Sequence, residues 1–172
     1  MEATAENIRD LPSSAYLNCP VRLSDGFMEI IAYTGNLLEK FETESISCEE
    51  VSANYAELLS FSEDLVQLWG FSPGQWRDSL FPVCALIDEL LMCSEWKEKE
   101  EWQKNQLHLA YFGTANAGEE FFRRLSELDR EDPERINPVR EVYAFCLAMG
   151  FKGKYYGPQD TGRLRDIRNS TL

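Results

Sequence analysis

Two neighbouring carboxylates, Asp88 and Glu89, lie inside the most apolar stretch of the sequence and are the first residues that could do chemistry. Paired carboxylates serve acid–base catalysis when a nucleophile or a set of metal ligands accompanies them. The sequence near this pair offers no such companion. Adjacent residues of a helix point about 100° apart, so at least one of the two can face away from the core. We favour a surface or intersubunit role over catalysis, and a merely solvated pair is an open alternative.

A second candidate is the glycine pair Gly113 and Gly118, which has the spacing of a phosphate-binding loop. That chemistry needs a lysine and a hydroxyl after the second glycine, where this chain has Glu119 and Glu120. Two carboxylates would repel a phosphate. We therefore expect a plain loop followed by a helix start.

A third candidate is the segment 150–155, in which two lysines alternate with glycines and aromatic residues. The lysines alone are weak evidence for an anion site, because no strand precedes them. Gly150 can instead adopt the left-handed conformation that ends a helix, which would place Phe151 over Cys146 or Leu147 as a hydrophobic cap. Gly153 allows a second sharp bend. The segment therefore predicts a rigid basic corner, made of Gly150, Phe151, Lys152, Gly153, Lys154 and Tyr155.

The composition argues against metal sites, disulfides and nucleic acid. The chain has one histidine, His108, and five cysteines without a C-x-x-C pair, so we predict no metal and no cofactor, and cysteines that are mostly buried. A formal net charge of −13 disfavours nucleic-acid binding. Residues 133–172 are the exception, with seven basic and four acidic residues. This basic end could pair with an acidic partner, lie beside an anionic membrane face, or be scattered solvated charge.

The apolar residues that must position these candidates recur at helical spacing, and no stretch alternates long enough for a strand. We predict an all-α, multi-helix bundle formed by residues 21–172, preceded by a flexible segment over residues 1–20. Pro82 is expected to kink or delay the third helix, and residues 129–135 are expected to form a connector. The punctuated stretch 70–74 could separate two subbundles. The expected helices cover residues 24–41, 47–69, 72–91, a segment ending at 112 after a loop from 94, 119–128 and 137–149.

Trp96 and Trp102 could make an exposed contact or belong to the core. The sequence shows no signal peptide, and no apolar run approaches the roughly 20 residues of a membrane-spanning helix. We expect a soluble segment from a reducing compartment.

Four segments in order, residues 84–91, 102–107, 117–125 and 143–155, resemble the TssL/DotU (IcmH/DotU) family of bacterial type VI and type IVB secretion systems. The last of them, which ends in the basic corner, carries the family signature. The resemblance implies a cytoplasmic domain of two helical subbundles arranged as a hook, tethered to the inner membrane by one C-terminal helix. This sequence ends before such a helix, so we expect the anchor beyond Leu172 and a short helix over residues 161–172 leading to it.

The same resemblance implies a scaffold without catalytic activity that binds the inner-membrane protein TssM and recruits the baseplate protein TssK. It associates Asp88 and Glu89 with baseplate contact and makes the corner at 150–155 chiefly architectural. The match favours type VI over type IVB, and the full-length protein could form a homodimer through its anchor. The alternative is a soluble regulatory or chaperone-like helical adaptor with an acidic binding surface.

Overall fold

The structure, a computed structural model, describes residues 21–132, 134 and 137–171, and within these ranges it contains helices and no strand. The expected flexibility of residues 1–20 concerns a segment outside the described residues. The helical elements are η2 (Leu23–Phe27), α1 (Met28–Lys40), α2 (Cys48–Leu68), α3 (Pro73–Met92), α4 (Lys99–Asn105), α5 (Leu107–Phe112), α6 (Ala117–Glu131), α7 (Pro138–Ala148), η3 (Pro158–Asp160) and α8 (Thr161–Thr171).

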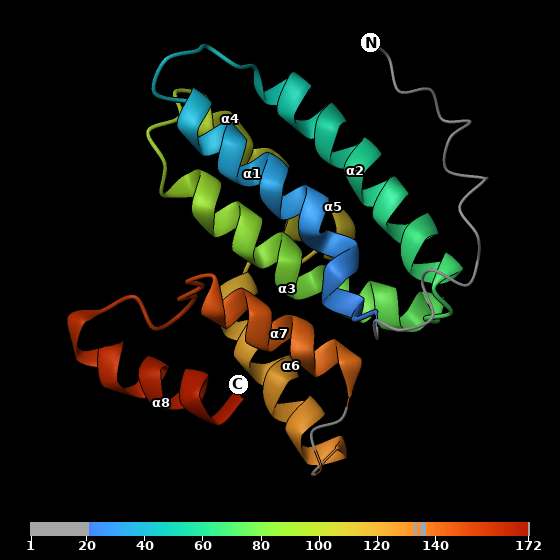
Figure 1. The fold of residues 1–172 in the computed structure, drawn as a ribbon. Helices are drawn as coiled ribbons and strands as arrows, with labels where there is room; N and C mark the ends of the chain where they lie inside the picture. Colours follow the sequence, from blue (N-terminus) through green and yellow to red (C-terminus); the bar gives the residue numbers. More distant parts are fainter. Residues whose placement is uncertain (1–20, 133, 135–136, 172) are drawn as a thin grey trace.

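Helix α3 forms the centre of the fold and contacts α1, α2, α4, α5, α6 and α7. Figure 1 shows α1 and α2 on one side of α3, and α6 and α7 on the other. One continuous apolar cluster runs through both groups. The predicted all-α bundle is confirmed. Because one apolar cluster unites both groups, the division into two subbundles and its boundary at residues 70–74 stay predictions.

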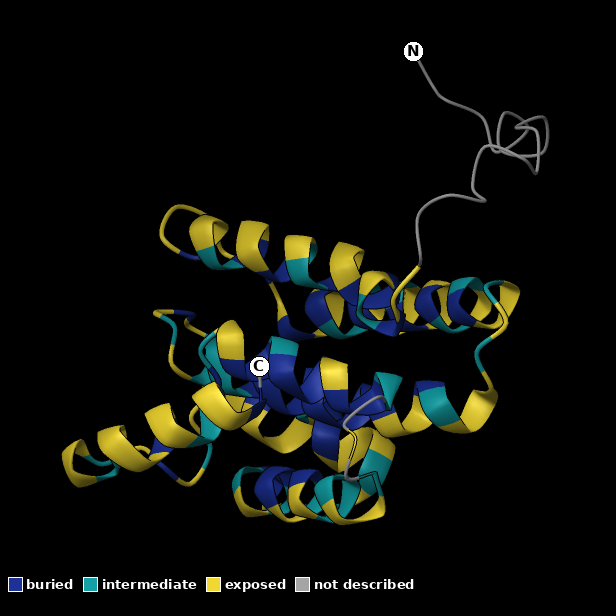
Figure 2. Ribbon diagram, turned by 60° about the horizontal axis from the view of Figure 1, so that its bottom comes forward, coloured by how far each residue is buried: buried dark blue, intermediate teal, exposed yellow. Residues whose placement is uncertain are grey.

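The central position of α3 follows from its sequence. All residues from Ser79 to Asp88 are buried, and Figure 2 shows the buried residues gathered in the middle of the molecule. Its start is set by a capping box in which Ser72 Oγ accepts the Gln75 N–H at 3.1 Å and Gln75 Oε1 accepts the Ser72 N–H at 2.9 Å. Pro82 lies in the helix interior and does not delay the start, because this cap fixes the helix one residue before Pro73.

Other helix ends agree with the sequence or depart from it for local reasons. Ser47 and Asn137 cap α2 and α7 as expected, through bonds from Glu50 N (3.2 Å) and Val139 N (2.9 Å). Helix α6 continues to Glu131, so the connector expected from residue 129 begins later. The single helix expected before residue 113 is divided at residue 106 into α4 and α5.

Several predicted core residues are placed as core. Trp96 and Trp102 are 2 % and 0 % exposed, so both belong to the interior and neither forms a surface contact. Of the described cysteines, Cys48, Cys84 and Cys146 are buried and unpaired, whereas Cys93 is exposed. None of the described helices is both long enough and apolar enough to cross a membrane.

Candidate functional site

Asp88 is a buried acceptor at the centre of the molecule, with a residue exposure of 1 %. Its Oδ1 accepts the indole N–H of Trp102 (3.0 Å) and the backbone N–H of Leu107 (3.0 Å). Its Oδ2 accepts the backbone N–H of His108 at 2.9 Å and lies 2.6 Å from His108 Nδ1. A carboxylate offers about four lone-pair sites, so these four contacts use its whole capacity.

These bonds explain why the chain breaks between α4 and α5. The first N–H groups of a helix have no partner within that helix and need an outside acceptor. Gln106 is extended, with ψ of 142°, and the two N–H groups that follow it point at Asp88. Asp88 therefore caps α5 from a different helix, and this capture favours a new helix start over a continuous one.

Glu89 lies one position further along α3 and is half-buried. Its Oε1 accepts the backbone N–H of Lys152 at 2.9 Å, and its Oε2 accepts that of Gly153 at 2.7 Å. Burial raises the pKa of Glu89 above its ordinary value, against the opposing effect of these two hydrogen bonds and of nearby basic side chains. Glu89 thus ties the central helix to the basic corner, and the structure brings these two predicted features together.

The corner itself ends α7 with the bonding of a Schellman motif. Gly150 has φ of 107° and donates its N–H to Leu147 O at 3.1 Å, while Phe151 donates to Cys146 O at 3.1 Å. The Phe151 side chain is 1 % exposed and lies 4.3 Å, centroid to centroid, from the ring of Phe121. The expected left-handed glycine is present, and Phe151 is buried as expected, but its ring packs on Phe121 and Phe122 of α6.

Gly153 and Gly118 allow the corner to pack backbone against backbone on α6. Gly153 has φ of 52°, and a Cβ built on it would lie 2.9 Å from Gly118 O. A Cβ on Gly118 would lie 3.1 Å from Lys154 N. The glycine of the supposed phosphate loop therefore serves close packing, and the side chain of Glu119 in that loop is bonded by Asn116 at 2.6 Å.

A surface hollow lies where these segments meet, and we call it the corner hollow. It is bounded by the second half of α3, the start of α5, the loop before α6 and the corner. Both carboxylates of α3 border it, so the predicted site residues converge on one place. Its lining also includes Met92, Cys93, Gln106, His108, Asn116, Gly118, Phe151, Gly153 and Tyr156.

The chemistry of the corner hollow is that of hydrogen bonding and packing. A carboxylate that binds a histidine ring can orient the ring for proton transfer. Asp88 binds the ring of His108 in this way. His108 is only 6 % exposed, however, and the described residues contain no group of three or more histidine, cysteine or acidic side chains able to hold a metal ion. The rim offers exposed Tyr156, whose hydroxyl lies 2.6 Å from Cys93 Sγ. This contact and partial burial raise the pKa of Tyr156 to about 12.

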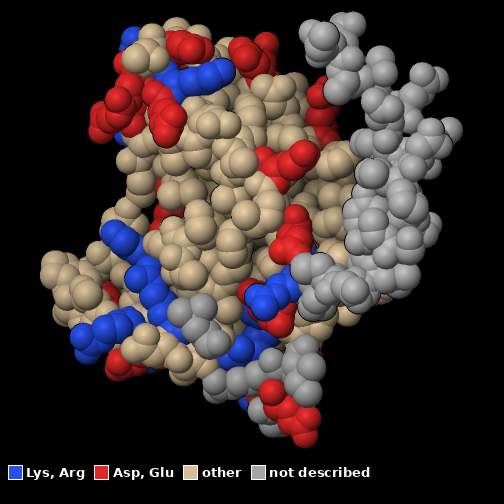
Figure 3. All heavy atoms as spheres, viewed as in Figure 1, with Lys and Arg blue, Asp and Glu red and all other residues tan. Residues whose placement is uncertain are grey.

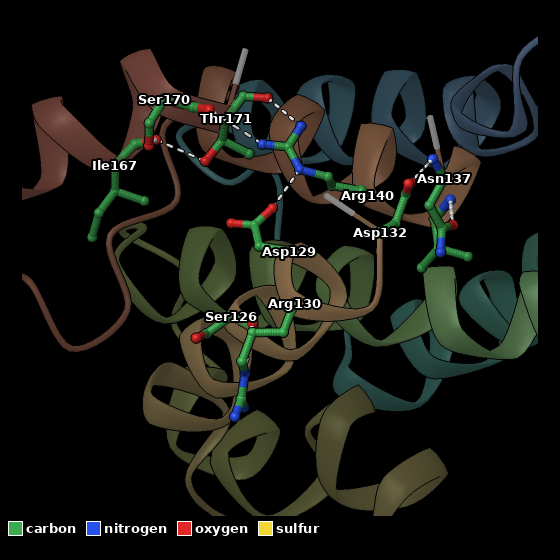
Figure 4. Close-up of polar contacts among 10 residues, drawn as sticks. Ser126, Asp129, Arg130, Asp132, Asn137, Arg140, Ile167, Ser170 and Thr171 are labelled. Carbon is green, nitrogen blue, oxygen red and sulfur yellow. Dashed lines mark hydrogen bonds and ion pairs between the residues drawn. The ribbon is translucent and has the colours of Figure 1, made fainter. Parts of the chain in front are cut away.

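A second set of contacts, which was not predicted from the sequence, fixes the C-terminal helix. Arg140 on α7 is 5 % exposed, and its Nε bonds Asp129 Oδ1 at 2.6 Å. Its two terminal nitrogens donate to the carbonyls of Thr171 (2.8 Å) and Ser170 (3.2 Å), the last turn of α8 (Figure 4). A cation near a helix C-terminus is favourable because the terminal carbonyls carry partial negative charge. Arg140 therefore clamps α8 to α7.

The charge of the surface is divided. In Figure 3 lysine and arginine side chains are concentrated in the lower half of the view, where α7 and α8 lie. Within the basic corner Lys152 and Lys154 are exposed, and Lys154 lies 5.3 Å from the Tyr155 ring centroid. The exposed basic residues of the C-terminal end lie on α8 and the corner, which are in contact: Arg168 donates to Phe151 O at 3.4 Å, and Arg163 lies 5.5 Å from the Tyr155 ring centroid.

The apolar neighbours of Asp88 along α3 indicate a buried position, although Glu89 shares this signal through Ala85 and Leu86. Cys84 precedes Asp88 by four residues and Leu91 follows Asp88 by three, so all three share one face of α3. Both apolar neighbours are fully buried. The bonds to Trp102 and His108 had no such signal, since they depend on how α4 and α5 fold back onto α3.

Comparisons with known proteins agree on one family. The family model described as type VI secretion system protein DotU matches residues 22–172. No match was found among curated proteins. The fold is similar to the cytoplasmic domain of TssL from Acinetobacter baumannii, with a TM-score of 0.75 and 24 % identity over 88 % of this chain and 94 % of that one.

Two further solved structures have the same fold. TssL from Vibrio cholerae gives a TM-score of 0.73 with 19 % identity over 90 % of this chain and 95 % of that chain. SciP/TssL from enteroaggregative Escherichia coli 042 gives 0.64 with 24 % identity over 86 % of each chain.

Proposed function

The chain belongs to the DotU family of type VI secretion proteins, subunits of the secretion membrane complex, and on this premise we propose that it is a non-catalytic scaffold. It binds a TssM-like inner-membrane protein and recruits a TssK-like baseplate protein. The contact surface is the corner hollow, with Asp88 and Glu89 as its organising residues.

One observation carries this proposal: two adjacent carboxylates of the central helix hold two separate segments around one hollow. Asp88 binds the start of α5, and Glu89 binds the basic corner. Asp88 is buried, so its part in partner binding is indirect, through the segments that it positions. Glu89 and the rim residues are accessible, and a partner can touch them directly. Rigid, pre-organised surfaces bind partners at lower entropic cost than mobile ones.

The proposal includes a location. The domain faces the cytoplasm and is held at the inner membrane, with α8 on the membrane side. Basic residues flanking a membrane segment favour the cytoplasmic side, and α8 with the corner supplies them. A homodimer of the full-length protein would then form through its membrane anchor.

Binding to purified TssK-like and TssM-like proteins of the same bacterium tests the proposal. Gln106→Arg with Asn116→Arg alters the rim without touching the buried bonds, and Glu89→Gln removes the charge but keeps the size. We expect each variant to weaken binding by at least about tenfold, as interface substitutions at a central contact do. Gln103→Arg, at an exposed position of α4, is the matched control.

Isothermal titration calorimetry measures the affinities, and melting temperatures establish that the variants remain folded. Wild-type affinity for both partners in the rim variants would exclude the corner hollow as the contact surface. Loss of binding in the Gln103→Arg control as well would place the contact elsewhere.

A further inference from the structure

Helix α2 carries two apolar stripes, and the fold uses only one of them. The inward stripe is buried and consists of Cys48, Val51, Tyr55, Leu59, Ser62 and Val66. The second stripe, which we call the outer stripe, consists of Leu58, Phe61, Leu65 and Leu68, spaced by three, four and three residues. Three of its members directly precede an inward residue, so the two stripes lie about 100° apart around the helix.

The outer stripe is unusually exposed for residues of its type. Leu68 is 81 % and Phe61 49 % exposed, whereas Leu58 and Leu65 are partly covered. Asn54 precedes Leu58 by four residues and lies on the same side of α2. Helix α1 covers this side at Asn54, whose Nδ2 donates to the hydroxyl of Tyr33 at 3.0 Å. Beyond Leu58, Phe61 and Leu68 are exposed, and Leu65 is partly covered. Single exposed apolar residues are ordinary, but a heptad-spaced row on one helix face is typical of a helix-binding surface.

The outer stripe has an acidic border. Glu57 and Asp64, seven residues apart, are exposed and lie along its outer edge, next to Phe61 and Leu68 by helical position. Neither makes an ion pair with another described residue. The whole of α2 contains five acidic residues and no basic one. A partner that covers the stripe therefore meets negative charge alone.

This charge selects among the possible occupants. A second copy of the chain would place one acidic border against another, which is unfavourable for a protein of net charge −13. Residues 1–20 of the same chain contain three acidic residues and one basic residue, and so do not complement the border either. An anionic membrane is repelled in the same way.

We propose that the outer stripe of α2 is a docking site for a basic amphipathic helix of a partner protein. Apolar side chains of that helix, spaced by three and four residues, cover Phe61, Leu65 and Leu68, and its lysine or arginine side chains face Glu57 and Asp64. Such helix-in-groove recognition uses anchors at these spacings. The stripe is about 15 Å long, or three turns, which indicates a small interface of the kind found in transient complexes.

The test uses a fluorescein-labelled, 14-residue peptide of leucine and lysine with leucines at helical spacing, and a matched peptide in which glutamate replaces lysine. Fluorescence anisotropy with the full chain measures binding. We expect micromolar affinity for the lysine peptide and at least about tenfold weaker binding of the glutamate peptide.

Protein variants then locate the site. Phe61→Ser with Leu68→Ser, and separately Glu57→Lys with Asp64→Lys, are expected to weaken binding of the lysine peptide at least about tenfold. Met149→Ser, which also removes an apolar side chain that is 45 % exposed, is expected to bind like the wild type. Hydrogen exchange should show protection by the peptide within residues 58–68 of the wild type.

Three results would overturn the proposal: unchanged binding in the serine double variant, equal binding of the glutamate peptide, or sedimentation showing a dimer of the chain that the serine variant abolishes. The last result would assign the stripe to a second copy. All substituted side chains are exposed, and melting temperatures equal to that of the wild type verify the fold. The outcome does not depend on the proposed binding of TssK-like or TssM-like proteins at the corner hollow.

Discussion

Replacing Asp88 with alanine removes both oxygens that hold the start of α5 and the Trp102 indole. Three N–H donors, those of Trp102, Leu107 and His108, then lose their acceptor, as does the His108 ring. A buried donor without a partner costs about 1–3 kcal/mol. The costs are not additive, and water can enter from the adjacent corner hollow, so we expect a total loss of about 3–5 kcal/mol of unfolding free energy.

Urea unfolding followed by tryptophan fluorescence measures this loss, which is a large part of the roughly 5–15 kcal/mol that stabilises a typical domain. At about 2–4 °C per kcal/mol, the melting temperature should fall by about 6–20 °C. Asp78→Ala, at an exposed position of the same helix, is the control and should change the unfolding free energy by less than about 0.5 kcal/mol.

A local measurement separates the proposed cause from general loosening. Hydrogen exchange at the amides of Leu107 and His108 should accelerate in Asp88→Ala more than exchange in α6 or α7. The reasoning would be refuted by an Asp88→Ala protein that melts within about 2 °C of the wild type, or by uniform acceleration without a larger effect at these two amides.

Three further substitutions test the corner, the clamp and an ion pair. Gly153→Ala should lower the unfolding free energy by about 1–3 kcal/mol in urea titrations, because its φ of 52° is strained for alanine and the new Cβ meets Gly118 O; an unchanged midpoint would contradict the close packing. Arg140→Ala should release the last turn of α8, seen as faster amide exchange there than in α3; equal exchange would show that the clamp is dispensable. Arg123 and Arg124 donate hydrogen bonds to Glu120 and lower its pKa to about 2. The stabilising effect of the Glu120 carboxylate is therefore complete above pH 4.5 and is lost as the pH falls toward 2. The stability difference between wild type and Glu120→Gln should shrink over that range in thermal melts, and a constant difference would exclude the pairing.

Helix starts were predictable because their signals are local. The capping side chains of Ser47, Ser72 and Asn137 act within three residues of the N–H groups that they bind. The left-handed Gly150 was predictable for the same reason, since a helix end requires that conformation and glycine adopts it without a steric penalty. These signals, with helical periodicity, were sufficient for the all-α class.

The departures from prediction have tertiary causes. The break at Gln106 depends on Asp88, which is about twenty residues away in sequence and captures the N–H groups of α5. Pro82 is tolerated inside α3 because the helix start is fixed by its own cap and the surrounding residues are packed on all sides. A stretch of sequence as long as one helix contains no information on either effect, because both depend on contacts with other helices.

In the candidate site, too, some features were predictable from the sequence and others depend on tertiary packing. Asp88 and Glu89 were identified from sequence as a pair, yet their environments differ, because one side chain points between α4 and α5 and the other toward the basic corner. Which carboxylate is buried follows from where those segments pack. Their adjacency alone could not distinguish them.

The helical class, the caps and the glycine-bounded basic corner could be inferred from the amino-acid sequence, since each rests on periodicity or on contacts between near neighbours. The family signature was recognised by its resemblance to known sequences. Four features could be known only from the packed fold: Asp88 caps α5 from within the core, Glu89 holds the corner, Arg140 clamps α8, and the outer stripe of α2 is exposed. These four features join residues far apart in the chain, or depend on what covers a helix face, and long-range packing alone sets them.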